Sequence, residues 1–571
     1  MKRPLTEFAA QPNLDVSSAT HTWSVKFWLA CAVVGVLAGL AGGLLMKLLR
    51  YVEHTVWNYD SGTLVEAASQ DSPWRHMLAL LTAGLLVGVV GFAIRKTLGR
   101  PGDADASIWF YSGRIPTLST LAQAVLSIVT VGMGVSLGRE SPIKQAGGTL
   151  ASRLAQWCRF SLAEQRLLVA CGVGAGMASA YNVPVGGALF AVEVLLGSMS
   201  LRIALPALLC SGIATLSSWL FLPAEPIYQV PEFPLTPQLT VWALLAGPLL
   251  GLATVPMVRA IDWAELHKPK RGWPVFIAPL VAMGVLGALS IPFPQLLGNG
   301  KDAVQLAFSD DLSITLLVVL PGLKLLVTCG CLGTGASGGL FTPTMKIGAL
   351  LGGLLGHGWN LIWPGASMGS CAVIGASAFL AAATQGPISS LVLVLELTRH
   401  VDGTMVPMLL AVTGAMLVAR RIEVRSIYSM RVHPAELNID PSATTLASPF
   451  GDQIATDFTT ISAAMSYGQV LQLLLTLPPH TTLYVLGHEG ELVGKIDAEV
   501  IRTTKLGSMP IVSAKASDIL VPVEPIHLTM TESDFRQRLA EATESELPVV
   551  DAKTHCLLGV VRTKLGLAQS P

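Results

Sequence analysis

The stretch "GVSLGRESPIKQAGG", which runs from Gly134 to Gly148, places Arg139 and Glu140 side by side within a long apolar region. Glycines stand on both sides of the charged pair, and Pro142 follows two residues after Glu140. Glycine and proline interrupt helices, and lipid permits an interrupted helix only where the freed backbone groups face protein or a water-filled cavity. Because ionisable side chains inside a membrane are costly, this stretch predicts a functional site.

The composition indicates that the stretch does lie in a membrane protein. The chain has 571 residues, of which 51% are hydrophobic and 13% are charged, whereas soluble proteins carry about 25% charged residues. Crossing a hydrocarbon core takes about 17–25 mostly apolar residues. We therefore predict a polytopic, all-α membrane protein rather than a soluble helical one. The predicted spans are 25–49, 76–94, 118–137, 204–222, 240–258, 275–291, 313–333 and 370–398.

Charge and cysteine usage exclude several kinds of partner. The 37 basic and 37 acidic residues balance, so no nucleic-acid partner is expected. The eight cysteines have no metal-ligand spacing, and no H-E-x-x-H or G-x-S-x-G motif suggests an enzyme. We expect no catalytic residue and no metal site.

Basic clusters in the loops predict the orientation. Cytoplasmic loops carry an excess of lysine and arginine, which would place both termini in the cytoplasm. Compact loops and the absence of targeting signals are typical of a bacterial inner-membrane protein. The clusters are Arg95/Lys96/Arg100, Lys268/Lys270/Arg271 and Arg420/Arg421/Arg425/Arg431.

The amino-acid composition and the hydrophobic pattern divide the chain into four parts. We predict a cytoplasmic segment over 1–24, a membrane domain over 25–431, a Pro/Ser/Asp-rich linker over 432–453 and a soluble α/β region over 454–571. In the last part, "TTLYVLGHEGELVGKIDAEVI" and "SELPVVDAKTHCLLGVVRTKLGLA" both predict strand, turn, strand and helix. This order resembles a pair of CBS modules. The resemblance implies a cleft for an adenine nucleotide, although Thr563 stands where a ribose-binding aspartate is usual, or else a role in stabilising a dimer.

The membrane domain contains an internal repeat. Residues 172–195 align without gaps on 375–398, so that Pro184 meets Pro387 and Glu193 meets Glu396. Upstream, "GRESPIKQAGG" (138–148) pairs with "GLFTPTMKIGA" (339–349). Two halves with matching interrupted segments are typical of transporters built from inverted repeats, with the substrate site near the membrane midplane. Exposed N–H groups at such helix starts attract anions, so we expect a bound anion at both motifs.

Glu140 is the distinctive side chain of this site. A buried carboxylate beside an anion-attracting helix start competes with the substrate for the same N–H groups, and it leaves when it is protonated. We therefore interpret Glu140 as a gate. The alternative is a structural ion pair with Arg139, although adjacent residues on a helix do not face one another.

Several motifs in order resemble the CLC family of chloride channels and proton/chloride antiporters. "GRESP" is similar to the family's G-R-E-G-P, "GGLFTP" matches G-x-F-x-P, "NVPVGGALFAVE" matches another hallmark, and "SIYSM" (426–430) fits the segment with a late tyrosine. The resemblance spans about 25–431. It implies a homodimer in the lipid bilayer, with one chloride pathway per subunit.

The resemblance also implies roles for individual residues. Glu140 would be the gating glutamate, and Tyr428 would offer its hydroxyl to the central anion unless it is an interfacial tyrosine. Chloride would be held by groups around five further residues, which are Gly138, Arg139, Ser141, Leu340 and Phe341.

Two departures from the family pattern concern the anion site. The G-S-G-I-P element is missing, and "RPGDADASIWFYSGRIP" stands in its region, where Ser107 is the candidate substitute. Lys144 and Lys346 occupy positions that are apolar in the family and nearly equivalent in the two repeats. They would raise the positive potential along the pathway, unless they snorkel or pair with Glu193 or Glu396.

A third departure concerns protons. Val194 stands where the antiporters carry an internal proton-relay glutamate, while the neighbouring Glu193 matches a structural glutamate of the family. Because valine cannot relay a proton, we favour a passive chloride channel of the voltage-gated type over a proton-coupled antiporter. A CBS-regulated cation transporter is a remote alternative, with Glu140, Glu193 and Glu396 as its clear acidic candidates.

Overall fold

The computed structural model divides the chain into two compact units, Met1–Val432 and His433–Pro571, which are described separately. The predicted linker 432–453, most of the predicted segment 1–24 and Thr563 lie outside the described residues. The structure describes residues 23–110, 113–399, 403–423, 425–429, 454–455, 458–463, 465, 470, 482–487, 491–497, 516–527, 530, 532–542, 546–550, 555 and 557–562.

The first unit consists of helices, and it is a polytopic membrane unit. Six described helices are long and apolar enough to cross a membrane: α1 (Val25–Trp57), α3 (Pro73–Thr97), α9 (Leu201–Ser218), α10 (Pro237–Leu266), α13 (Ile314–Gly333) and α17 (Met405–Ile422). The others are α2 (Leu64–Gln70), α4 (Ala104–Phe110), α5 (Thr117–Gly132), α6 (Glu140–Trp157), α7 (Leu162–Tyr181), α8 (Pro184–Leu189), α11 (Pro274–Ser290), α12 (Lys301–Phe308), α14 (Phe341–Asn360), α15 (Met368–Thr384) and α16 (Pro387–Thr398). A π-helical segment, Phe190–Leu195, continues α8, and a 3₁₀ turn covers Pro294–Leu296.

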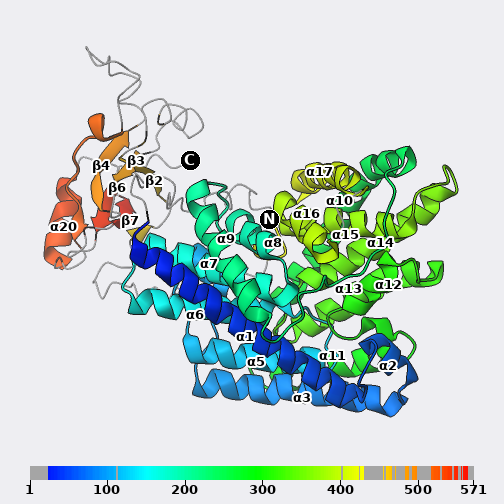
Figure 1. Cartoon of the computed structure of the whole chain (residues 1–571). Helices are drawn as coiled ribbons and strands as arrows, with labels where there is room; N and C mark the ends of the chain where they lie inside the picture. The colour runs from blue at the N-terminus through cyan, green and yellow to red at the C-terminus, as the bar shows by residue number, and fades with distance from the viewer. Residues whose placement is uncertain are drawn as a thin grey trace. The chain divides into compact units, whose positions relative to one another are not determined.

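Helix α1 shows how the apolar sequence packs. The Ser24 side chain caps its first turn by accepting from the N–H of Phe27. Small residues on one face let α9 approach closely, because a Cβ at Gly39 would meet the carbonyl oxygen of Ala214. In Figure 1, α1 (dark blue) passes α5, α7 and α9, whereas α13 to α17 (green to yellow) group together.

The predicted span 370–398 is wrong as a single helix. The chain turns at Gln385, which has a left-handed backbone (φ 59°), and a new helix starts at Pro387. Proline suits a first helical position, where its missing N–H is not needed. The first repeat breaks in the same way, with Asn182 at φ 58° and Pro184 opening α8. The predicted spans also omit α17, which ends in Arg420 and Arg421.

The second unit contains two small mixed sheets. The first has the order β2 (Thr459–Ser462), β3 (Thr482–Leu486) and β4 (Leu492–Asp497), with β2 parallel and β4 antiparallel to β3. The second has the order β1 (Ile454–Ala455), β7 (Leu557–Arg562), β6 (Glu546–Val550) and β5 (Ile526–His527), with β5 parallel to β6. Helix α20 (Glu532–Glu541) precedes β6. The two predicted strands are confirmed in both repeats, whereas the predicted turns and the helices predicted after them lie outside the described residues.

Candidate functional site

The two interrupted motifs of the sequence meet in the structure. Helix α6 begins at Glu140, and α14 begins at Phe341. Just before these starts, Gly138 and Gly339 form an antiparallel bridge, in which each N–H donates to the other's carbonyl at 2.7 Å. Two helix N-termini from different halves of the chain therefore lie together, and both carry a partial positive charge. The bridge occupies the N–H of Gly138, so the prediction that this group binds chloride does not fit the geometry.

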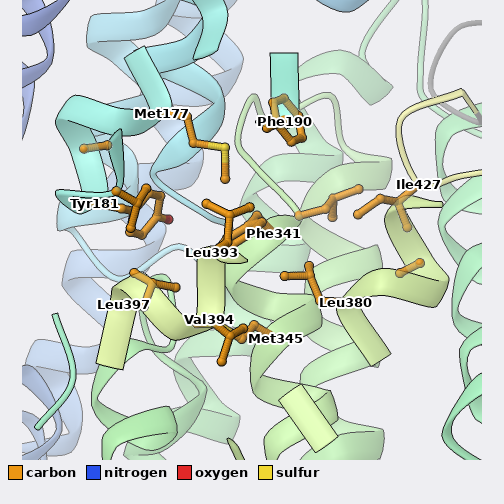
Figure 2. Close-up of a cluster of buried hydrophobic side chains, with 14 of the residues drawn as sticks. Met177, Tyr181, Phe190, Phe341, Met345, Leu380, Leu393, Val394, Leu397 and Ile427 are labelled. Carbon is orange, nitrogen blue, oxygen red and sulfur yellow. The ribbon is translucent and has the colours of Figure 1, made fainter. Parts of the chain in front are cut away.

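The Glu140 carboxylate lies at the start of α14, and the side chain is 1% exposed. The N–H of Phe341 donates to Oε1 at 2.6 Å. The Tyr181 hydroxyl donates to Oε2 at 2.9 Å, and Oγ1 of Thr342 lies 3.4 Å from the same oxygen. Figure 2 shows Tyr181 and Phe341 within one cluster of buried side chains. The carboxylate thus occupies the place that an anion would take at a helix N-terminus.

The alternative ion pair between Glu140 and Arg139 is wrong. The ion pairs among the described residues do not include this pair, and the Arg139 guanidinium lies 4.9 Å from the centre of the Tyr181 ring. The two side chains leave the start of α6 in different directions because neighbouring helical residues do not face each other.

The glycines of both motifs make room for the carboxylate. A Cβ at Gly138 or at Gly339 would collide with the carboxylate of Glu140. Any residue other than glycine at either position would therefore push Glu140 out of its place. This close approach explains why both motifs need glycine there.

A polar cavity of about 340 Å³ reaches the residue next to Glu140. Arg139 forms part of its wall, together with the cations Arg50 and Lys301 and the acids Glu53 and Asp302. Burial, and then the nearby charge of Arg139, lower the pKa of Lys301, while Asp302 opposes the shift. The charge of Arg139 therefore acts on the groups that line this cavity.

One turn beyond Glu140 on α6, Lys144 is buried between two aromatic rings. Its Nζ lies 4.3 Å from the ring centre of Tyr428 and 4.6 Å from that of Phe190. Oδ2 of Asp105, on α4, lies 3.4 Å from the same Nζ. Tyr428 is 2% exposed, so the alternative of an interfacial tyrosine does not fit. The predicted late tyrosine thus shares its surroundings with a buried ion pair.

Glu193 and Glu396, which align in the two repeats, each cap a helix of the other repeat. Glu396 accepts from the N–H groups of Val185 and Gly186 at 3.0 and 2.6 Å. Glu193 accepts from those of Ile388 and Ser389 at 3.1 and 2.6 Å. Each carboxylate thus satisfies the first N–H groups of the other repeat's proline-initiated helix. The structural interpretation of Glu193 is confirmed.

The same contacts exclude the pairing considered for the two lysines. Lys144 pairs with Asp105, and Nζ of Lys346 donates to the carbonyl of Gln295 at 2.5 Å. Neither lysine contacts Glu193 or Glu396, whose carboxylates are used by backbone N–H groups. Both lysines are fully buried rather than snorkelling to a surface.

The remaining predicted residues lie on α4, at the start of α6 and just before α14. Ser141 is the second residue of α6, and Leu340 is the N-cap of α14, so both border the meeting point. The Ser107 hydroxyl, in contrast, donates at 2.7 Å to the carbonyl of Asp103, the residue just before α4. The residue of α4 that reaches Lys144 is Asp105.

Sequence reasoning missed Tyr181 and Thr342, the two hydroxyl groups at the Glu140 carboxylate. Thr342 lies inside the predicted "GGLFTP" motif, and Tyr181 ends α7 immediately before the break at Asn182. The position of Tyr181 directly before a predicted helix break was the signal in the sequence that could have identified it as a site residue.

The chain is similar to known chloride channels and transporters. Residues 102–420 match the family model described as "Voltage gated chloride channel". The "Voltage-gated ClC-type chloride channel ClcB" of Escherichia coli is 31% identical over 427 residues, which cover 72% of this chain and 98% of that protein. The crystal structure of a slow cyanobacterial Cl⁻/H⁺ antiporter has 23% identity and a TM-score of 0.63, covering 72% of this chain and 97% of its own. A eukaryotic CLC transporter, at 18% identity and a TM-score of 0.58, covers 94% of this chain and 98% of its own.

Proposed function

The chain belongs to the voltage-gated chloride channel family, whose members move anions across membranes and are not enzymes, and on this premise we propose that it conducts chloride passively past Glu140. The supporting observation is the Glu140 carboxylate itself, which accepts from the N–H of Phe341 and the hydroxyl of Tyr181. These donors are suited to any small anion, and the carboxylate is an anion tethered to the chain.

Competition between the carboxylate and chloride provides the gate. An ionised Glu140 blocks the start of α14, whereas a protonated one loses its charge and releases the N–H of Phe341. Chloride then takes the vacated position, flanked by the starts of α6 and α14 at Ser141 and Leu340. The Arg139 guanidinium, in the wall of the adjoining cavity, attracts the incoming ion.

A second anion position lies at Tyr428. Its hydroxyl is the ligand that the family resemblance implies, and Lys144 adds a buried positive charge 4.3 Å from its ring centre. Asp105 balances this charge in the absence of an anion. Ser107, on the same helix as Asp105, is the second hydroxyl proposed for this position.

Passive conduction is favoured because Val194 lacks an ionisable group. Val194 follows directly on Glu193, whose carboxylate caps α16, so that Glu193 is not available to carry protons. A purified, reconstituted channel should show a reversal potential set by the chloride gradient alone. A pH gradient imposed across the proteoliposomes is expected to leave that potential unchanged.

The same recording tests the antiporter directly. A fixed chloride-to-proton stoichiometry would shift the reversal potential by an amount that the pH gradient determines. Such a shift would reject the channel and support the proton-coupled antiporter. Protein-free liposomes provide the control for leak.

We further propose a homodimer in a bacterial inner membrane, with both termini in the cytoplasm and with the second unit acting as a CBS pair. Its two sheets each combine a parallel and an antiparallel strand pair, which supports two related modules. An adenine nucleotide is the ligand proposed for the pair.

A further inference from the structure

The ion pair of Lys144 with Asp105 is buried inside the membrane unit. Nζ of Lys144 lies 3.4 Å from Oδ2 of Asp105, and the two side chains are 3% and 8% exposed. A buried ion pair adds little to stability, because the loss of hydration costs about as much as the attraction between the charges returns. Charged side chains inside a membrane therefore point to a function.

Two aromatic rings and one carboxylate lie around the Lys144 ammonium. The rings of Phe190 and Tyr428 meet edge to face, with their centres 5.4 Å apart. Nζ lies in the corner between them, 4.6 Å from the centre of the Phe190 ring and 4.3 Å from that of Tyr428. Ring faces attract a cation but carry no net negative charge. Asp105 supplies the negative charge at this ammonium.

Helix α4 is held at both ends, so the backbone of Asp105 has a fixed position. At the start of the helix, Oε1 of Gln145 accepts from the N–H of Ala104 at 2.8 Å. Near its end, Nε1 of Trp109 donates to the carbonyl of Leu195 at 2.8 Å. Moving the carboxylate away from the ammonium therefore takes a rotation of the Asp105 side chain and no movement of α4.

The ion pair lies along the same helix face as Glu140. Residues four apart on a helix lie one above the other, so Glu140 and Lys144 share a face of α6. The N–H of Ile427 donates to the carbonyl of Ala383 at 2.9 Å, which fixes Tyr428 beside this face. The second anion position proposed above is thus one helical turn along α6 from the first.

The two carboxylates have equivalent relations to their donors. Glu140 occupies the N–H of Phe341, a group that suits an anion. Asp105 likewise occupies the ammonium of Lys144. Chloride carries the same charge as the carboxylate, so it gains the ammonium only when the carboxylate leaves. We propose that Asp105 is a second gate, a built-in counter-anion that chloride displaces in order to bind at Lys144. This inference rests on the proposed function, because it states how the second anion position of that function is opened.

The test compares chloride binding with and without the Asp105 carboxylate. Sodium chloride is titrated calorimetrically into the full-length protein in detergent, with sodium isethionate keeping the ionic strength constant. Glu140 is retained, so its carboxylate still occupies the first position. The variants are Asp105→Asn and Asp105→Ser, each alone and combined with Lys144→Met. Asp311→Asn, which changes an exposed aspartate after α12, is the matched control.

Asp105→Asn and Asp105→Ser should bind chloride at least about tenfold more tightly than the native protein. An anion that contacts Nζ of Lys144 is less than about 10 Å from Oδ2, and removing one like charge at that distance has this effect at an effective dielectric constant near 20. Adding Lys144→Met should abolish the gain, and Asp311→Asn should bind as the native protein does. Equal affinities in the native protein and the Asp105 variants would overturn the inference, as would a gain that persists without Lys144.

Thermal stability gives a second measurement, because removing one partner of a buried ion pair is strongly destabilising. Chloride that takes the place of the carboxylate should reverse this loss, so the melting temperature of Asp105→Asn should rise more than that of the native protein when chloride replaces isethionate. The combination with Lys144→Met should not show this additional rise. An equal loss of stability in both salts would mean a structural ion pair and would overturn the inference. Failure of both Asp105 variants to fold even in chloride would overturn it too.

Glu140→Gln separates this inference from the proposed function. Its vacated first position should add chloride binding to that of the native protein, whatever Asp105 does. A gain in Glu140→Gln without one in the Asp105 variants overturns only the second gate. No gain in Glu140→Gln overturns the proposed function itself.

Discussion

Glu140→Gln is expected to remove the pH dependence of chloride flux. The glutamine is neutral at every pH, so it cannot compete as an anion for the N–H of Phe341. In the native protein the neutral fraction of a carboxyl group grows up to about tenfold for each unit that the pH falls, and flux should rise with it until that fraction saturates. Chloride efflux from proteoliposomes between pH 4.5 and pH 8 measures both profiles. The flux through the variant should vary less than about twofold across this range.

The control for this prediction is Glu232→Gln, which changes an exposed glutamate in the loop before α10. It should keep the native pH profile. If the chloride flux through Glu140→Gln still rises as the pH falls, Glu140 is not the gating residue, whatever the absolute rate of flux.

Glu193→Ala and Glu396→Ala are expected to have the opposite pattern, with lost stability and retained pH gating. Each substitution removes the acceptor of two backbone N–H groups at the start of the other repeat's helix. Hydrogen bonds to charged groups contribute about 1.5–3 kcal/mol each, and partial exposure reduces this, so we expect a loss of about 2–4 kcal/mol in either variant. The apparent melting temperature in detergent, followed by size-exclusion chromatography after heating, measures the change.

The equivalent contacts of Glu193 and Glu396 make the predicted loss of stability more specific. Because the contacts are reciprocal, the two alanine variants should be destabilised by similar amounts. The glutamine variants should lose less, since each keeps one carbonyl oxygen as an acceptor. Unchanged stability combined with lost pH gating in Glu193→Ala would show that this glutamate takes part in proton movement.

The positions of the helix breaks could be predicted from the sequence because glycine and proline act locally. Pro184 and Pro387 each begin a helix, and this effect does not depend on contacts with distant parts of the chain. The same local argument placed anion-attracting N–H groups at Phe341, and the structure has one there. The partners of these groups could not be predicted, because a contact such as that of Tyr181 with Glu140 depends on how distant helices pack.

The region around Tyr428 illustrates the same limit. The missing G-S-G-I-P element predicts that another hydroxyl takes the place of its serine, and Ser107 was the candidate. The structure instead brings Asp105 and Lys144 together beside Tyr428, from segments 39 residues apart. Charge pairs of this kind leave no periodic pattern in a sequence. Lys324 went unnoticed for a similar reason, because the sequence does not show what a single lysine in an apolar helix faces. In the structure its Nζ donates to the Ser136 hydroxyl and to the carbonyls of Leu296 and Gly298.

The most direct test of the account is the position of an anion in the Glu140→Gln protein. Crystals grown with bromide in place of chloride would locate the ion by its anomalous scattering. The account predicts a bromide at the start of α14, within hydrogen-bonding distance of the N–H of Phe341 and the hydroxyl of Tyr181, where the native carboxylate lies. Well-ordered crystals with bromide bound elsewhere and none at Phe341 would contradict it.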